Sequence, residues 1–342
     1  MKKFLFFFLL SIISFLSCSN NREYVTNKGL FNLVKNIKAR YIALPEIHNI
    51  LDFVPTENYW LVQDEVKDEG TQIYVYRARD HKFLYSFVRR GHGKGEALAL
   101  DMIQNPKGDT LKIIDQAKYK ISTFLLNDDK AQLLSEEHLQ LDNVGPLQEI
   151  YLHRDSILLF NILDGSIMAY SCGSNRIVSE FKLPQMKSLT IEQQRKMNDF
   201  HFGYYGGKIC MGFRNMNLIL YGSVDDKNQI KIESEDQYQA QAKQFSNNGE
   251  DMMYYSYVSM GKNYTMGQFL GYKFPFMSKL KGSVMDLDLK SFIEVYSVQM
   301  KPMLYLIPAE EFIRCKINPF DNDIYAWNPK DEEPCLMFYQ LR

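Results

Sequence analysis

The recurrence of short strand-like segments is the sequence feature that most limits the possible folds. Aromatic and β-branched residues alternate with polar ones in runs such as QIYVYRAR (72–79) and KFLYSFVRR (82–90), as in half-buried β-strands. The runs form six groups, near residues 59–90, 97–134, 147–183, 198–233, 252–297 and 303–341. The groups repeat roughly every 40 to 50 residues, the period of propeller blades. The pattern predicts an all-β, six-bladed β-propeller.

Two other all-β folds remain open. The repeat boundaries between 233 and 300 are poorly defined, so a seven-bladed propeller is the first alternative and a two-sheet sandwich with insertions the second. Helical periodicity is confined to TIEQQRKMN (190–198) and DQYQAQAKQFSNN (236–248), whereas EALALDMIQN (96–105) fits either a strand or a helix. A parallel βαβ fold would need a helix in every connection. Since a single blade cannot bury both faces, the ring must close, and we expect YIALPEI (41–47) to complete the C-terminal blade.

The N-terminus predicts export. Lys2 and Lys3 precede an uncharged apolar run, FLFFFLLSIISFL (4–16), which is shorter than the roughly 20 residues of a membrane-spanning helix and is typical of a signal peptide. Ser17-Cys18 and the polar residues after them resemble a bacterial lipoprotein cleavage box, in which Cys18 carries the lipid. An ordinary signal peptide with a chance cysteine is the alternative. We expect a signal peptide at 1–17, a lipid-anchored linker at 18–39 and one propeller domain at 40–342.

Charge and cysteine content exclude two classes of protein. The formal net charge is −1 for the whole chain and becomes more negative once Lys2 and Lys3 are removed with the signal peptide. Nucleic-acid binding normally needs a clustered basic excess, so no nucleic-acid partner is expected. The remaining cysteines lack the CxxC spacing of a zinc ribbon; they are Cys172, Cys210, Cys315 and Cys335. An oxidising envelope would permit a Cys315–Cys335 disulfide, and buried thiols are the alternative.

A glycine-rich stretch, FVRRGHGKGEAL (87–98), places Gly91, Gly93 and Gly95 at alternate positions before Glu96. A dinucleotide-binding loop needs G-x-G-x-x-G between a strand and a helix, and a P-loop needs G-x-x-x-x-G-K-[ST]; neither string is present here. Alternating glycines more simply permit positive φ angles and close backbone approach. We interpret these four residues as a structural loop at the end of a blade.

The same stretch carries a family resemblance. The string S-F-x-R-x-G-x-G-x-G-E (86–96) resembles the blade-end signature of the TolB-like six-bladed β-propeller lipoproteins of Bacteroidales type, with Lys94 and Ala97 in place of the usual proline and phenylalanine. The pattern from Phe292 to Trp327 resembles the final blade of that family. The resemblance covers about residues 40 to 342. It implies a six-bladed fold and a cell-envelope location, at the outer membrane with the periplasmic or surface side undecided, and it transfers no catalytic residues.

Few residues are arranged for chemistry. The histidines show no HxH or HExxH spacing, so no metal or other cofactor is expected; they are His48, His81, His92, His138, His153 and His201. Two carboxylate pairs, Asp286 with Asp288 and Asp321 with Asp323, could each face one side of a strand and bind calcium, although turn aspartates are common. In HFGYYGG (201–207), His201, Tyr204 and Tyr205 could stack on a ligand, or could pack in the core.

Two functions remain after these observations. The first is a non-enzymatic binding or scaffold protein, held to the membrane by its lipid, for an envelope protein, a peptide or a glycan. The second is an envelope hydrolase or lyase whose site is assembled from several blades at the axial mouth of the propeller. A cluster of histidine and carboxylates with shifted pKa at the mouth would favour the enzyme, and a broad exposed apolar face would favour the binding protein.

Overall fold

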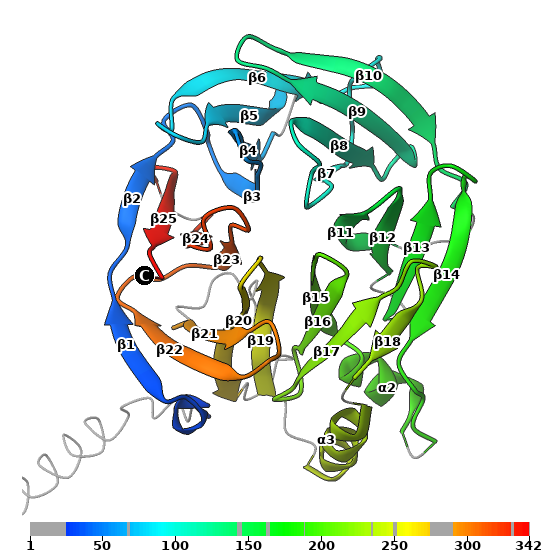
Figure 1. The fold of residues 1–342 in the computed structure, drawn as a ribbon, viewed down its shortest axis with the longest axis vertical. Coiled ribbons are helices and arrows are strands. Elements are labelled where there is room, and N and C mark those ends of the chain that lie inside the picture. Colours follow the sequence, from blue (N-terminus) through cyan, green and yellow to red (C-terminus); the bar gives the residue numbers. More distant parts are fainter. Residues whose placement is uncertain are drawn as a thin grey trace, which may run out of the picture.

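Six β-sheets surround a central axis in the computed structural model (Figure 1). The model describes residues 25–66, 69–141, 146–161, 165–187, 189–233, 235–248, 252–273, 290–329 and 332–341. The predicted signal peptide, Cys18, Asp286 and Asp288 lie outside these ranges. The prediction of an all-β, six-bladed propeller is confirmed, and the seven-bladed and sandwich alternatives are wrong.

The first four blades are antiparallel sheets of four strands that follow one another along the chain. Blade one contains β3 (Ile50–Pro55), β4 (Tyr59–Asp64), β5 (Thr71–Arg77) and β6 (Phe83–Arg89). Blade two contains β7 (Leu100–Met102), β8 (Thr110–Asp115), β9 (Lys120–Leu126) and β10 (Ala131–His138). Blade three contains β11 (Leu147–His153), β12 (Ser156–Asn161), β13 (Ser166–Ser171) and β14 (Arg176–Lys182). Blade four contains β15 (Phe200–Tyr205), β16 (Lys208–Phe213), β17 (Ile219–Val224) and β18 (Ile230–Ile232).

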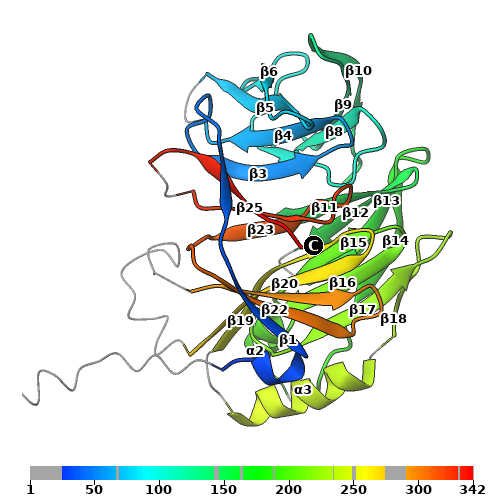
Figure 2. The same ribbon diagram turned by 60° about the vertical axis from the view of Figure 1, so that its left-hand side comes forward.

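The last two blades each include a strand from the N-terminal segment. Blade five contains β19 (Met252–Met260), β20 (Tyr264–Lys273), β21 (Phe292–Ser297) and β22 (Pro302–Pro308), with β1 (Leu33–Ile37) parallel to β22. Blade six contains β23 (Arg314–Ile317), β24 (Ile324–Trp327) and β25 (Cys335–Tyr339), with β2 (Arg40–Ala43) antiparallel to β25. Figure 2 shows β1 and β2 crossing the outside of these blades. The chain therefore closes the ring as predicted, through a strand that overlaps 41–47.

Some sequence-based boundaries need correction. Blade one begins at Ile50 instead of 59, and residues 303–308 belong to blade five instead of blade six, because β22 pairs with β21. Residues 33–37, which the sequence placed in a linker, form β1 at the edge of blade five. The ambiguous segment 96–105 contains the short strand β7.

Both predicted helices are present, in connections between blades. α2 (Ile191–Met197) begins with a capping box, in which Thr190 and Gln193 satisfy each other's backbone N–H groups. α3 (Glu235–Asn248) buries Tyr238 against blade four. A short 3₁₀ turn, η1 (Lys28–Leu30), precedes β1. No helix within the described ranges is long and apolar enough to cross a membrane.

The core consists of apolar layers between neighbouring blades. Blades one and two share a layer that includes Val54, Leu61 and Phe124, and blades six and one are joined by a layer that includes Trp327 and Phe53, both fully buried. Full burial of one such side chain stabilises the fold by about 1.5 to 3 kcal/mol. Packing around the whole ring therefore holds the six innermost strands in fixed positions about the axis.

The cysteines of blade six do not form a disulfide. Cys315 lies on β23 and Cys335 on β25, with β24 between them, and both are thiols. Cys315 is fully buried, and burial raises the pKa of its thiol well above the usual value. The buried-thiol alternative therefore holds for Cys315.

Candidate functional site

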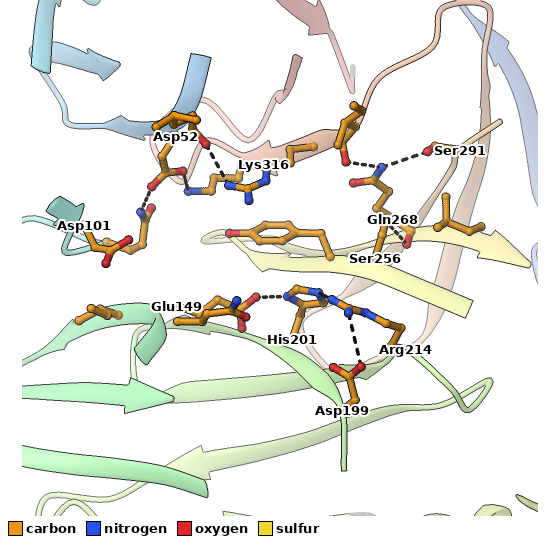
Figure 3. Close-up of a pocket in the computed structure, with 18 of the residues that line it drawn as sticks. Asp52, Asp101, Glu149, Asp199, His201, Arg214, Ser256, Gln268, Ser291 and Lys316 are labelled. Carbon is orange, nitrogen blue, oxygen red and sulfur yellow. Dashed lines mark hydrogen bonds and ion pairs between the residues drawn. The ribbon is translucent and has the colours of Figure 1, made fainter. Parts of the chain in front are cut away.

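A cavity of about 830 Å³ lies on the propeller axis (Figure 3). Side chains from all six blades line it, and most belong to the innermost strands β3, β7, β11, β15, β19 and β23. The lining residues fall near the beginnings of these strands, such as Asp52 on β3 and Arg314 on β23. The cavity therefore occupies the end of the axis where the innermost strands begin, and its volume is typical of small-molecule sites.

The cavity has a floor. Gln104, Tyr257 and Lys316 line both this cavity and a much smaller space of about 20 Å³ further along the axis. The smaller space is bounded by residues at the far ends of the innermost strands, including Pro55 and Met260. The three shared side chains lie between the two spaces and form the floor of the larger one.

A buried ion pair joins blades one and six at this floor. Lys316 Nζ binds the Asp52 carboxylate and donates to the Phe53 carbonyl oxygen at 3.2 Å. Gln104 Nε2 donates to the second Asp52 oxygen at 2.9 Å. Burial lowers the pKa of Lys316 and the Asp52 charge opposes that change. Both charges therefore have partners inside the protein.

The backbone of blade three directs Glu149 into the cavity. Glu149 has a φ of +53°, and the pairing of β11 with β12 shifts between Gln148 and Tyr151. Such bulges re-aim a side chain and are over-represented beside functional sites. Figure 3 shows Glu149 beside His201, and its two oxygens contact the His201 ring and the Phe202 N–H.

The His201 ring lies between an acidic side chain, Glu149, and a basic one, Arg214. Its Nδ1 bonds to Glu149 Oε1, and its Nε2 lies 2.9 Å from Arg214 Nη2. Because a guanidinium can only donate, Nε2 accepts and Nδ1 carries the proton that it donates to Glu149. Arg214 also lies 3.4 Å from Asp199. The side chains of Asp199 and Arg214 are 40% and 36% exposed, against 8% and 13% for Glu149 and His201, so this chain of contacts runs from the mouth inward.

Asp101 adds to the pocket wall a carboxyl group with a raised pKa. Burial raises the pKa of Asp101 to about 6, although a hydrogen bond from Gln116 opposes the change and the charge of Asp52 adds to it. The group is therefore close to half protonated near pH 6. It can donate or accept a hydrogen bond at the wall of the pocket.

The opposite side of the pocket is made of amide, hydroxyl and apolar groups. Gln268 Nε2 donates to Ser291 Oγ at 3.0 Å and to the Ile313 carbonyl at 3.1 Å. Figure 3 shows Gln268, Ser256 and Ser291 across the pocket from Asp101. Apolar side chains complete the lining, among them Leu51, Met252, Met253, Leu270 and Phe312. Five blades therefore contribute ionic groups to the pocket, and blade five contributes uncharged polar and apolar surface.

Of the predicted ligand-stacking residues, only His201 reaches the pocket. Tyr204 is 5% exposed, and its hydroxyl group bonds to His153 between blades three and four. Tyr205 is half-buried at the end of β15 and does not line the cavity. A ligand in this pocket therefore cannot stack on Tyr204 or Tyr205.

The predicted glycine loop connects β6 to β7 and does not line the pocket. Glu96 Oε2 accepts a 2.7 Å hydrogen bond from the Gly93 N–H, and a Cβ on Gly91 would lie only 2.2 Å from the same oxygen. Among the three glycines only Gly95 has a positive φ, +74°, and its N–H donates to Glu136 at 3.0 Å. The loop therefore folds around the Glu96 carboxylate and is bound to blade two through Glu136.

The Asp321–Asp323 pair lies in the turn between β23 and β24. Asp321 accepts hydrogen bonds from Asn318, Tyr325 and the Asp323 N–H, and Asp323 accepts one from the Leu341 N–H. These bonds occupy both carboxylate oxygens of Asp321 and one of Asp323. Over the described part of the chain, no group of three or more His, Cys, Asp or Glu residues could hold a metal ion.

Sequence reasoning missed Asp52, Asp101 and Glu149. A signal for them is nevertheless present, because four inner strands share a titratable residue followed by an apolar one. The matching tripeptides are LDF (51–53), LDM (100–102), QEI (148–150) and FHF (200–202). With blade one beginning at Ile50, alignment of the blades on their first strands places these four side chains in one ring.

Comparison with known proteins supports the fold. No protein-family model and no curated protein sequence matches the chain. A crystal structure from Bacteroides fragilis, of a protein inferred to be exported, has a TM-score of 0.56 at 11% identity and covers 90% of this chain and 98% of that one. The β-propeller domain of Cps50 (Swd1) from Myceliophteria thermophila has a TM-score of 0.51 at 11% identity, and the match covers 89% and 100% of the two chains. The chain is thus a six-bladed β-propeller with an axial pocket, and at these identities the similarity shows the fold alone.

Proposed function

We propose that this protein is a cell-envelope lipoprotein of TolB-like type, anchored through Cys18, that binds a small polar ligand in its axial pocket without altering it. The observation that carries the proposal is the pocket itself, which is lined by all six blades and has Gln104, Tyr257 and Lys316 at its floor. A peptide or a glycan fits this volume, whereas a folded protein partner could insert only a segment.

The arrangement of charges supports binding. Asp52 with Lys316, Glu149 with His201, and Asp199 with Arg214 are paired within the protein. Because these side chains are already fixed in position, a ligand would bind without the entropic cost of ordering them. The apolar part of the wall suits the faces of sugar rings or aliphatic side chains.

The envelope location rests on the N-terminal sequence. The apolar run at 4–16, the cleavage-box resemblance at Cys18 and the blade-end resemblance at 86–96 favour a lipoprotein of the outer membrane. The similar structure from Bacteroides fragilis belongs to a protein inferred to be exported, which agrees with that location.

A thermal-shift screen of envelope peptides and glycans would test the binding proposal. A ligand present at 100 times its Kd stabilises the fold by about 2.7 kcal/mol, which is a readily measured shift in melting temperature. The matched variants are Ser256→Trp, which places an indole group in the pocket, and Lys262→Trp, at the other end of the axis. A ligand that stabilises both variants equally would contradict the proposal.

A hydrolase or lyase is the second candidate, favoured by the raised pKa of Asp101 on the blade next to Glu149 of the Glu149–His201 pair. A half-protonated carboxyl is suited to donate a proton to a leaving group. Mass spectrometry of each ligand after incubation separates the two candidates. Unchanged ligand supports binding alone, whereas products that disappear with Asp101→Asn would support the enzyme.

A further inference from the structure

The N-terminal segment meets the propeller beside the mouth of the pocket. Val25 N–H donates to the Gly271 carbonyl oxygen at 2.8 Å. Gly271 has a φ of +64°, and a Cβ there would lie 2.2 Å from the Val25 carbonyl oxygen. Because Gly271 directly follows Leu270, which lines the pocket, Val25 is held close to the mouth.

A second attachment holds the same segment to blades four and five. The side-chain amides of Asn27 and Asn217 exchange two hydrogen bonds of 2.8 Å, and Asn27 Nδ2 also donates to Tyr255 Oη at 3.2 Å. Asn27 is only 6% exposed. Asn215 and Ser256, close in sequence to these partners, line the pocket. The position of the segment is thus fixed by buried polar contacts.

The distance from the predicted lipid to this point is short. Seven residue steps separate Cys18 from Val25, and they span at most about 25 Å when fully extended. An innermost strand of six residues, such as β3, is about 20 Å long. A lipid at Cys18 can therefore lie beside the mouth with slack in the chain. It can lie beside the far face only when the chain is nearly straight, which removes most of its conformational freedom.

From this geometry we infer that the pocket opens toward the membrane that carries the Cys18 lipid, and that its ligand is the polar head group of a membrane-borne molecule. The inference rests on the lipid anchor and the pocket of the proposed function, and it adds the orientation and the source of the ligand.

The lining of the mouth indicates the chemistry of that head group. Arg314 is exposed and donates from Nη1 to the Leu51 carbonyl at 2.9 Å, which uses one of its five N–H donors. Arg214 lies at the mouth as well. Planar guanidinium groups bind carboxylates and phosphates in pairs of hydrogen bonds. We expect an anionic group at the mouth and hydroxyl groups deeper, beside Gln268 and Asp101.

Fluorescence quenching would test the orientation. The full-length lipidated protein is placed in vesicles of phosphatidylethanolamine and phosphatidylglycerol that carry a quencher on the head groups. A fluorescent amino acid replaces either Glu311, next to pocket residue Phe312, or Lys262, in the turn between β19 and β20 at the other end of the axis; both positions are exposed. We expect quenching at 311 to be several-fold stronger than at 262, and equal or stronger quenching at 262 would overturn the inference.

Flotation of the same vesicles separates two kinds of failure. Protein that does not float, with an unmodified Cys18 by mass spectrometry, would refute the anchor of the proposed function and with it this inference. Protein that floats but shows stronger quenching at 262 would refute only the orientation and would leave the proposed anchor and pocket intact.

Crosslinking in cells would test the source of the ligand. A diazirine-bearing amino acid of similar size replaces Met253, which lines the pocket, and Lys262 serves as the matched control position. After proteolysis has separated the lipidated Cys18 peptide, we expect only the peptide that carries position 253, and not the one that carries position 262, to hold a crosslinked adduct with radiolabelled fatty acid. An adduct at 253 without fatty acid would indicate a soluble glycan or peptide, and labelling equal to that at 262 would indicate no pocket ligand; either result would overturn the inference.

Discussion

Glu294 makes the stability of blade five dependent on pH. This carboxyl group lies on β21, is fully buried, and accepts hydrogen bonds from the hydroxyl groups of Tyr255 and Tyr296. Burial raises the pKa of Glu294 from 4.5 to about 7, with the two hydroxyl groups opposing the change. Between these pH values the folded state holds more protons than the unfolded state, so the free energy of unfolding falls as pH rises. At 1.36 kcal/mol per pKa unit, the loss is about 3 kcal/mol in all.

Urea denaturation at pH 5 and pH 8 would measure this effect in the wild type and in Glu294→Gln. About 2.5 kcal/mol of the loss falls within that pH range, and the glutamine, which cannot ionise but can still accept both hydrogen bonds, should lack it. Asp101 titrates near pH 6 in both proteins. The contribution of Glu294 is therefore the difference between the wild type and Glu294→Gln in how the free energy of unfolding changes with pH. Parallel profiles would refute the assignment of the pH dependence to Glu294.

Three further predictions concern stability measured by denaturation. Asp52→Asn leaves the Lys316 ammonium buried without its counter-charge and should cost about 3 to 5 kcal/mol, most of which the double variant Asp52→Asn/Lys316→Met should restore; a cost under 1 kcal/mol would contradict the ion pair. Gly95→Ala forces alanine to a φ of +74° and should cost about 1 to 2 kcal/mol, whereas Gly173→Ala, with no atom within 4 Å of its new Cβ, should stay within about 0.5 kcal/mol. Deletion of residues 335–342 removes β25 and leaves β2 without its partner, so the melting temperature of the whole domain should fall; an unchanged value would show that the ring does not depend on this closure.

Much of the fold could be predicted from local pattern. Alternating runs such as 72–79 identified strands because each strand of a blade packs its apolar side chains against the next blade. The two helices followed from their periodicity, and Thr190 with Gln193 formed the cap that the sequence allows. The boundary at 303 was misplaced because β22 belongs to blade five, where it pairs with β21 and with the N-terminal strand β1, and local alternation does not show with which neighbour a strand pairs.

The pocket could be predicted only in small part. His201 was selected for its aromatic neighbours, yet it reaches the axis because it lies near the beginning of β15, and Tyr204 turns into the interface with blade three. Asp52 and Lys316 are 264 residues apart, so no motif joins them. The positive φ of Glu149 could not be predicted either, because a glutamate inside a strand-like segment normally has a negative φ.

Native mass spectrometry of the protein extracted from its own envelope would show whether the axial pocket holds a small polar ligand. We expect one bound small molecule per chain on the wild type and on Lys262→Trp, and none on Ser256→Trp, whose indole lies in the pocket. The same bound species on all three proteins would place the ligand outside the axial pocket and contradict the proposed function.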